Sequence, residues 1–233
     1  NCVSYDPTYA YELAVILQDG LRRMYAEKEN VFYYITLMNE NYVHGTMPDG
    51  AEEGIRRGMY RLREGGKHAL RVQLLGAGTI LREVEAAAAM LESDYGVSAD
   101  IWSVTSFNQL RREGMEIERW NLLHPEAEQK RPWVWECLAD TEGPVIASTD
   151  HMKLYADQIR PYVRRSYRVL GTDGFGRSDS RGKLRYFFEV DRNFVVLAAL
   201  KALADEGSIK PSVVSDAMKI FGIDADKPFP PRS

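Results

Sequence analysis

The hydrophobic residues near the start of the chain follow two different patterns in succession. Over positions 8–28 apolar side chains recur at helical spacing and charged residues fill the remaining positions, which predicts an amphipathic helix. Asp6-Pro7 immediately before it is a natural helix start. Positions 31–38 are apolar almost throughout, which is typical of a strand buried on both faces of a parallel sheet.

From Arg71 onward short apolar runs alternate with helical patterns. This alternation predicts an α/β fold with a mostly parallel sheet covered by helices on both faces. The predicted strands are 72–75, 100–104, 144–148 and 167–170. The predicted helices are 79–95, 107–113, 116–123, 151–159, 181–187, 192–206 and 211–221.

Between these two parts lies a region rich in turn-forming residues. Residues 42–50 are expected to form a loop and residues 51–64 a charged helix that ends at Gly65-Gly66. The division expected from this is an N-terminal part at 1–45, a linker with a short helix at 46–69, and an α/β domain at 70–233. The proline-rich stretch 227–231 is expected to form an extended tail.

Composition narrows the class of protein. The formal net charge of −4 and the pI of about 5.7 argue against a nucleic-acid-binding surface. No apolar run approaches the ~18 residues that a membrane helix needs, so no membrane partner is expected. Cys2 and Cys137 match no metal-ligand spacing and are expected to be free thiols.

Two glycine-rich turns follow predicted strands. Gly76-Ala77-Gly78 lacks the third glycine of a dinucleotide fingerprint, because position 81 is Leu, and is best explained as a tight turn. The segment 171–181 reads GTDGFGRSDSR and has no Lys-Ser/Thr pair, so it is not a P-loop. It is either a capped structural turn or an anion-binding loop. Its candidate residues are Gly171, Asp173, Gly174, Gly176, Arg177, Ser178, Asp179 and Arg181.

A polar segment follows the strongest predicted strand. Asn39, Glu40, Asn41 and Tyr42 come directly after positions 31–38, and ligands gather beyond the carboxyl ends of parallel strands. These residues are therefore candidates for a substrate channel, with a hydrogen-bonded loop that fixes the domain linker as the alternative. The four histidines (His44, His68, His124 and His151) share no metal-ligand spacing.

Several strings in the chain, taken in order, closely resemble one family. GTDGFGRSDSR with the FFEVD that follows it resembles the C-terminal domain of homodimeric bacterial pyruvate dehydrogenase E1 components, which are thiamine-diphosphate dependent and belong to the transketolase superfamily. The resemblance covers the whole chain and roughly the last quarter of the E1 polypeptide. It is also carried by residues 5–12, 33–36, 39–42, 50–55, 104–107, 118–121, 147–150 and 221–227.

The resemblance implies a division of labour within a longer protein. Residues 1–45 would end the middle domain, which binds the pyrimidine ring of the cofactor, so the helix and strand at 8–38 would lack the rest of their sheet. The chain starts at Asn1 without a methionine and is expected to be a fragment. The parent enzyme, cytoplasmic and bacterial, would decarboxylate pyruvate on thiamine diphosphate with Mg²⁺. It would then pass the two-carbon unit to lipoyl groups of the E2 dihydrolipoyl acetyltransferase.

No catalytic residue carries over to this chain. The family's Gly-Asp-Gly and Asn-Asn motifs do not occur in it, and its activating glutamate and active-site histidines would lie upstream. The isolated chain is therefore expected to be inactive and to bind no cofactor, with a structural and assembly role as homodimer contact and E2 partner. The alternatives are a stand-alone α/β module that binds a small anion, and an E1 component for another 2-oxo acid.

Overall fold

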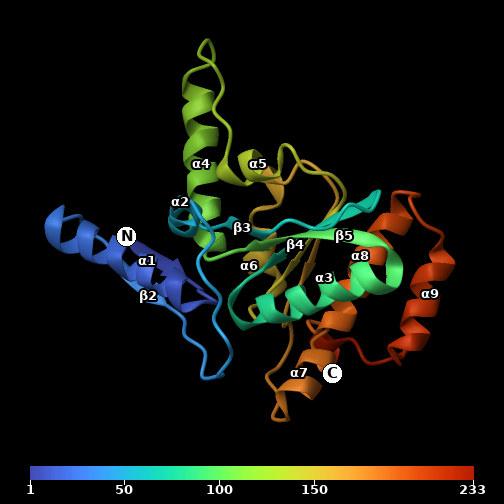
Figure 1. Ribbon diagram of the computed structural model, residues 1–233. Helices are drawn as coiled ribbons and strands as arrows, with labels where there is room; N and C mark the ends of the chain where they lie inside the picture. Colours follow the sequence, from blue (N-terminus) through green and yellow to red (C-terminus); the bar gives the residue numbers. More distant parts are fainter.

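The computed structural model describes all 233 residues, and a five-stranded sheet lies at its centre (Figure 1). Four strands are mutually parallel and β3 is antiparallel at one edge, in the order β3-β5-β4-β6-β7. The prediction of a mostly parallel sheet is confirmed. The strands are Tyr60–Arg63 (β3), Leu70–Gly76 (β4), Val97–Ser103 (β5), Val145–Ser148 (β6) and Tyr167–Leu170 (β7).

Helices cover both faces of this sheet, as predicted. Alternation along β4 directs Val72 and Leu74 into the core of one face and Leu75 into the core of the other. The first face carries α3 (Leu81–Tyr95), α8 (Arg192–Asp205) and α9 (Pro211–Ile220), and the short η2 (Gly78–Ile80) leads into α3. The second face carries α4 (Phe107–Leu123), α5 (Trp133–Leu138), α6 (Lys153–Asp157) and η3 (Arg160–Tyr162).

The N-terminal residues form a smaller unit beside the sheet, at the blue end of Figure 1. Its strands β1 and β2 pair in parallel, and its small core includes Tyr60 of β3, which links it to the main sheet. The elements are β1 (Cys2–Tyr5), α1 (Ala10–Leu21), η1 (Arg22–Ala26), β2 (Phe32–Ile35) and α2 (Ala51–Arg57). The predicted helix and strand are both present, and β1 is an additional strand beside β2.

The expectation that the strand at 31–38 is buried on both faces is wrong for this chain. The strand itself spans Phe32–Ile35, and the side chains of Phe32 and Tyr34 are 52% and 62% exposed. The cause is that β2 pairs only with β1 and nothing in this chain covers its outer face. An apolar run therefore does not by itself show that both faces of a strand are covered within the chain.

The linker differs from its prediction as well. The expected helix at 51–64 ends at Gly58, whose φ of +110° favours glycine, and Tyr60–Arg63 forms the edge strand β3 instead. The range 46–69 therefore contains part of the sheet. The region 107–123 is one continuous helix rather than two, and α5 was not predicted.

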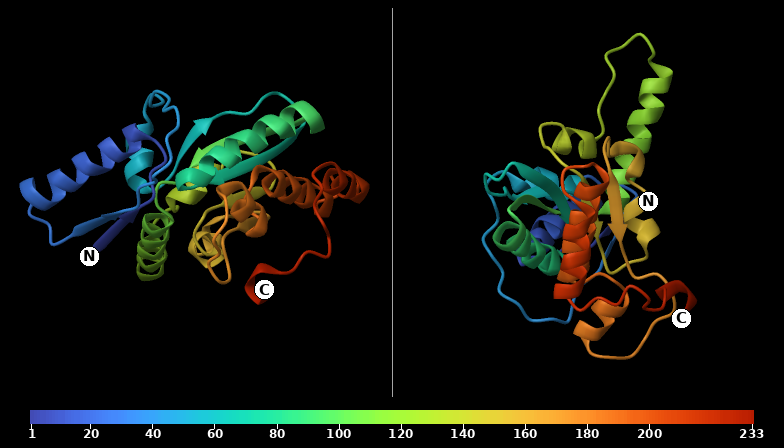
Figure 2. Two further views of the ribbon diagram at one scale, coloured as in Figure 1. Left: turned by 90° about the horizontal axis from the view of Figure 1, so that it is seen from below. Right: turned by 90° about the vertical axis from the view of Figure 1, so that its right-hand side faces the viewer.

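The last part of the chain folds back onto α7. Helix α7 (Arg181–Phe187) follows the glycine-rich loop, and Lys227 donates a hydrogen bond from Nζ to the carbonyl of Phe187 at 3.0 Å. The stretch expected to be an extended tail ends in the short η4 (Pro230–Arg232). In the right-hand view of Figure 2 this dark-red segment runs between the lower end of α9 and α7.

Candidate functional site

The carboxyl ends of the parallel strands meet at one edge of the sheet, and the N-terminal unit is hydrogen-bonded to that edge. The backbone N–H of Asp6 donates to the carbonyl of Thr105, just beyond β5, at 2.7 Å. The N–H of Gly78, just beyond β4, donates to the carbonyl of Asp6 at 3.2 Å. Ligands gather at this edge in open parallel sheets, which makes it the first candidate for a site.

Asp6 is the buried centre of the contact between the two units. Its carboxylate accepts hydrogen bonds from Thr36 Oγ1 at 2.7 Å, Tyr155 Oη at 2.6 Å and His151 Nε2 at 3.1 Å. Burial opposes ionisation, but the hydrogen bonds from His151, Thr36 and Tyr155 outweigh it and hold the pKa of Asp6 below its usual value. The hydrogen bond to Asp6 in turn raises the pKa of His151.

Glu40 is a second point of contact, and its carboxylate is surrounded by three arginines from the two helices α3 and α7. Its carboxylate lies 2.7 Å from Arg82 Nη1, 3.1 Å from Arg185 Nη2 and 3.4 Å from Arg181 Nη1. Thr79 Oγ1 also donates to it at 3.1 Å. Burial raises the cost of its charge, but the hydrogen bonds from Thr79 and Arg82 and the charges of the arginines hold the pKa of Glu40 below its usual value.

The Glu40 contacts continue into a chain of ion pairs along α3 and α7. Arg185 bridges Glu40 and Glu83, with its Nη1 3.0 Å from Glu83 Oε1. Glu83 also pairs with Arg192 at the start of α8, at 2.9 Å. Burial works against the charge of Glu83, but hydrogen bonds from Arg192 outweigh it and lower the pKa of Glu83. The network therefore holds α3, α7 and α8 to the segment after β2.

The first half of the loop 171–181 is anchored by the backbone. Asp173 Oδ1 accepts a hydrogen bond from the N–H of Lys153 at 2.9 Å, which fixes the loop to the start of α6. Gly174 has a φ of +108°, and a Cβ there would lie 2.6 Å from the carbonyl oxygen of Pro230. Gly171 is buried. This half of the loop therefore has a structural role.

The second half of the loop is exposed and loosely held. A Cβ at Gly176 would meet nothing within 4 Å, and the side chain of Ser178 makes no hydrogen bond. Asp179 accepts a hydrogen bond from the N–H of Ser180 at 2.7 Å and lies 3.7 Å from Lys183 Nζ. The guanidinium of Arg177 lies 4.9 Å from the ring centroid of Phe187 and has no carboxylate partner.

The structure brings the two predicted candidate segments together. Arg181 Nη2 donates to Asn39 Oδ1 at 2.7 Å and also approaches Glu40. Tyr42 donates its hydroxyl proton to the carbonyl of Thr8 and carries Arg82 over its ring at 4.6 Å. Asn41 is exposed, and it is the one residue of this segment whose side chain makes no hydrogen bond.

A cavity of about 370 Å³ opens between these segments. Burial raises the pKa of the Asp150 carboxyl on its wall, which has no hydrogen-bond partner in another residue. Three arginines offset this acid, so the cavity combines positive charge with an apolar lining. Its wall is formed by Met38, Thr79, Ile80, Asp150, Thr172, Gly174, Gly176, Arg177, Arg181, Leu184, Arg185, Phe188 and Val190.

The remaining reactive side chains are dispersed. His44 Nδ1 accepts from the N–H of Ala10 at 2.9 Å, and His124 stacks on Trp120. No group of three or more His, Cys, Asp or Glu side chains is placed to hold a metal ion. Cys2 and Cys137 are free thiols, and burial raises the pKa of Cys137 to about 12. None of the helices has the length and apolar character needed to cross a membrane.

Sequence reasoning missed most of the residues that partner the predicted ones. Asp6 was interpreted only as part of a helix start, and Thr79, Arg82, His151 and Arg185 were not singled out as partners at the sheet edge. All of these except Arg185 follow a parallel strand within six positions, and Asp6 comes directly after β1. Ligands gather beyond the carboxyl ends of parallel strands. A search for polar residues after every predicted strand, rather than only after 31–38, would have found Thr79, Arg82 and His151.

Two family models match the chain. Residues 58–191 match the transketolase-like C-terminal domain, and residues 1–45 match the middle domain of the pyruvate dehydrogenase E1 component.

The chain is also similar to curated proteins over almost its full length. It is 63% identical over 232 residues to the pyruvate dehydrogenase E1 component of Pseudomonas aeruginosa, which covers 99% of this chain and 26% of that protein. It is 58% identical over 234 residues to the pyruvate dehydrogenase E1 component of Escherichia coli K12, with the same coverage of 99% and 26%. The chain thus spans about a quarter of the length of these relatives.

Solved structures share the fold at low sequence identity. An inactive beta4 tetramer of a split-gene transketolase superposes with a TM-score of 0.57 at 19% identity, over 88% of this chain and 57% of that one. A Pichia stipitis transketolase in complex with sedoheptulose-7-phosphate gives a TM-score of 0.58 at 16% identity, over 89% of this chain and 26% of that one. At these identities the likeness concerns the fold alone.

Proposed function

This chain belongs to the transketolase-like C-terminal domain family, and we propose that it is the structural and assembly part of a pyruvate dehydrogenase E1 component. The identity of 63% over 99% of the chain to one such component supports the proposal. We divide the chain into the end of the middle domain (1–45), a connection (46–69) and the C-terminal α/β domain (70–233). The two family matches support this division, with β3 drawing part of the connection into the sheet.

For the full-length protein we propose the reaction of its named relatives. It would decarboxylate pyruvate on thiamine diphosphate with Mg²⁺ and pass the two-carbon unit to lipoyl groups of E2. Thiamine diphosphate supplies the electron sink for this chemistry when it is bound. An E1 component for another 2-oxo acid is the alternative, and substrate competition in the full-length enzyme separates the two.

The residues of this chain do not fit that cofactor. No Gly-Asp-Gly or Asn-Asn motif is present, and no acidic cluster is placed to hold Mg²⁺. We therefore assign no catalytic step to the residues of this chain. We propose instead that contacts within the chain hold the middle-domain segment, residues 1–45, in place against the C-terminal domain.

The observation that carries this role is the pair of carboxylates at the sheet edge. Asp6 and Glu40 both belong to residues 1–45, and each is bound by groups from residues 79–185. Asn39 accepts a hydrogen bond from Arg181, and Tyr42 bonds the carbonyl of Thr8 and lies beneath Arg82. These contacts support the hydrogen-bonded loop over a substrate channel for this segment. Asn41 remains as the residue with a free side chain for a channel role.

Turnover of the full-length enzyme tests the assignment. In Glu40→Gln the melting temperature should fall while the turnover of folded enzyme, measured with an artificial electron acceptor, stays within a few-fold of the parent. Glu52→Gln, an exposed residue on α2, is the matched control. A large loss of turnover at an unchanged melting temperature would give Glu40 a catalytic role and contradict the proposal. Calorimetry on the isolated chain should detect no binding of thiamine diphosphate with Mg²⁺.

A second candidate function is binding of a small anion in the cavity beside the loop 171–181. The unpaired guanidinium of Arg177 at the wall of that cavity favours it. Thermal unfolding in the presence of inorganic phosphate, compared between the parent and Arg177→Ala, tests this. Stabilisation that depends on Arg177 would support an anion site, and equal curves would leave the loop a structural one.

We propose that the partners of this chain are a second E1 subunit and the E2 acetyltransferase. We propose the bacterial cytoplasm as its location. The uncovered apolar side chains Phe32 and Tyr34 on β2 support contact with further protein. The net charge of −4 supports the view that nucleic acid is not a partner.

A further inference from the structure

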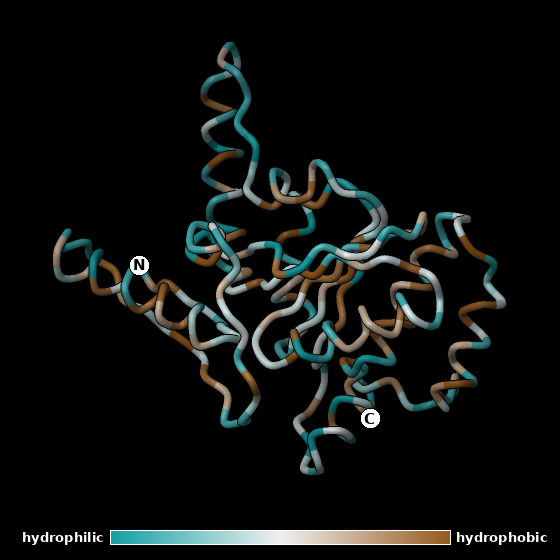
Figure 3. The backbone as a smooth tube through the Cα atoms, in the orientation of Figure 1, coloured by the Kyte–Doolittle hydropathy of each residue, from teal (hydrophilic) through white to brown (hydrophobic).

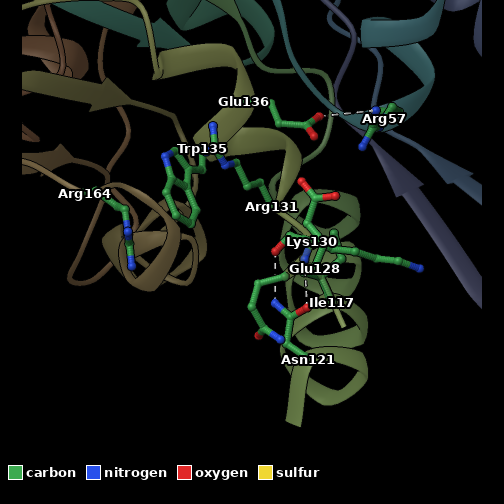
Figure 4. A pocket seen from close by; sticks show the side chains of 10 residues that line it. Arg57, Ile117, Asn121, Glu128, Lys130, Arg131, Trp135, Glu136 and Arg164 are labelled. Carbon is green, nitrogen blue, oxygen red and sulfur yellow. Dashed lines mark hydrogen bonds and ion pairs between the residues drawn. The ribbon is translucent and has the colours of Figure 1, made fainter. Parts of the chain in front are cut away.

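An open groove lies on the opposite side of the molecule from the contacts described above, between the projecting half of α4 and helix α5. Helix α4 extends well beyond the sheet, and the chain returns from its tip along a hydrophilic loop (Figures 1 and 3). The groove has a volume of about 1220 Å³. It is lined by Arg57, Ile117, Asn121, Glu128, Gln129, Lys130, Arg131, Trp135, Glu136 and Arg164 (Figure 4).

The groove is positively charged although the chain as a whole is acidic. Its wall carries four cationic side chains and two glutamates, which leaves an excess of two positive charges, against a net charge of −4 for the chain. Arg57 is already committed, because it pairs with Glu113 at 2.6 Å and lies 3.8 Å from Glu136. The excess charge therefore resides on the other three cations.

Lys130, Arg131 and Arg164 have no carboxylate partner and rest on tryptophan rings instead. Arg164 and Arg131 lie 3.8 and 5.1 Å from the ring centroid of Trp135, which Figure 4 shows between them. Lys130 lies 4.0 Å from the ring centroid of Trp120. A guanidinium that stacks through its face keeps the N–H groups of its edges free for a carboxylate. The two arginines are thus held in position for an acidic ligand at little further entropic cost.

We propose that this groove binds an acidic segment of a partner protein. Carboxylates of that segment would pair with Arg131 and Arg164, and its apolar side chains would lie along Ile117. The groove exceeds the ~300–1,000 Å³ usual for small-molecule sites, which favours a peptide. Nucleic acid fits less well, because cations already cover the indole faces that bases would stack on. The inference goes beyond the proposed function, which does not require it.

The test is fluorescence anisotropy with a fluorescein-labelled peptide of alternating Glu and Ala, titrated with the full-length protein at low salt. Saturable binding that weakens as NaCl is raised is expected. The double variant R131E/R164E should bind at least tenfold more weakly. Its control is R112E/K219E, which changes the net charge equally at exposed residues outside the groove and should bind within twofold of the parent.

Further measurements keep the outcome decisive. R131K/R164K conserves the charge and should bind with intermediate affinity, because lysine lacks the planar pair of N–H groups that holds a carboxylate. This variant replaces R131E/R164E in the comparison if R131E/R164E fails to fold. Absence of saturable binding, or an equal loss in both charge-reversal variants, would overturn the proposal. Two other results would also overturn it: displacement of the peptide by lower concentrations of oligothymidylate, or a dimer that dissociates in R131E/R164E. They would assign the groove to nucleic acid and to a second copy of the chain, respectively.

Discussion

Glu40 Oε2 and Arg185 Nη2 lie 3.1 Å apart although 145 positions separate the two residues in the chain. Glu40 follows β2 of the N-terminal unit, whereas Arg185 belongs to α7, beyond the last strand of the main sheet. Their side chains are only 19% and 15% exposed, so solvent and salt screen the pair less than a surface ion pair. The contact joins residues 1–45 to an element built from the far end of the chain.

The three arginines near the glycine-rich loop should differ in their effect on stability. Arg185→Ala removes a partner from both Glu40 and Glu83, although each keeps another arginine, and should lower the free energy of unfolding by about 1–3 kcal/mol. Arg181→Ala removes a half-exposed contact and should cost about 0.5–1 kcal/mol. Arg177→Ala should change it by about 0.5 kcal/mol or less. Urea denaturation measures all three, and an effect of Arg177→Ala as large as that of Arg185→Ala would contradict this order.

The Asp6–His151 pair should make stability depend on pH near neutrality. The pKa of His151 is raised in the fold, so its contribution is complete below the ordinary value of 6.5 and is lost as the pH rises through the raised pKa. The pKa of Asp6 is lowered, so its contribution is complete above 3.8 and is lost as the pH falls through the lowered pKa. The advantage of the parent over His151→Asn should therefore be greatest between these two values and shrink above pH 6.5.

Thermal unfolding across this range, on the parent and on His151→Asn, measures the change. His124→Asn is the control, since His124 stacks on Trp120 and bonds a carbonyl rather than a carboxylate. A difference between the parent and His151→Asn that stays constant from acid to alkaline pH would mean that the pair does not ionise as described.

Two glycines in helices should respond to alanine in opposite directions. A Cβ at Gly114 of α4 would lie 2.2 Å from the ring of Tyr162, whose hydroxyl is held by Arg111 and Glu118. Gly114→Ala should therefore cost about 1–3 kcal/mol through overpacking. A Cβ at Gly182 of α7 meets nothing within 4 Å, so Gly182→Ala should be neutral or stabilise by up to about 1 kcal/mol. Chemical denaturation compares them, and equal effects would mean that α4 does not pack on Tyr162.

The main sheet was predictable because its central strands are buried on both faces. Val72, Ile101 and Ile146 belong to short apolar runs that have no other simple explanation. The edge strand β3 was not recognised, because Tyr60-Arg61-Leu62-Arg63 alternates apolar and basic residues directly after a charged helix. Strand β1 is only four residues long and gives too little pattern.

The sequence indicated some residues of the candidate site but not the contacts between them. Asn39 and Glu40 were indicated because they follow a strand, and Arg181 because it ends a glycine-rich loop. Their contact with one another was not, since it depends on how α7 packs against the segment after β2. Periodicity and spacing report on neighbours along the chain, whereas Glu40 and Arg185 meet only through the tertiary fold.

The coupling free energy between Glu40 and Arg185 tests the central claim, that this chain holds residues 1–45 against the α/β domain. A double-mutant cycle of Glu40→Gln and Arg185→Gln in the full-length protein, measured by chemical denaturation, isolates that energy. We predict a favourable coupling of about 1 kcal/mol or more, within the range found for residues in one ion-pair network. A coupling indistinguishable from zero, with both single variants as stable as the parent, would contradict the account.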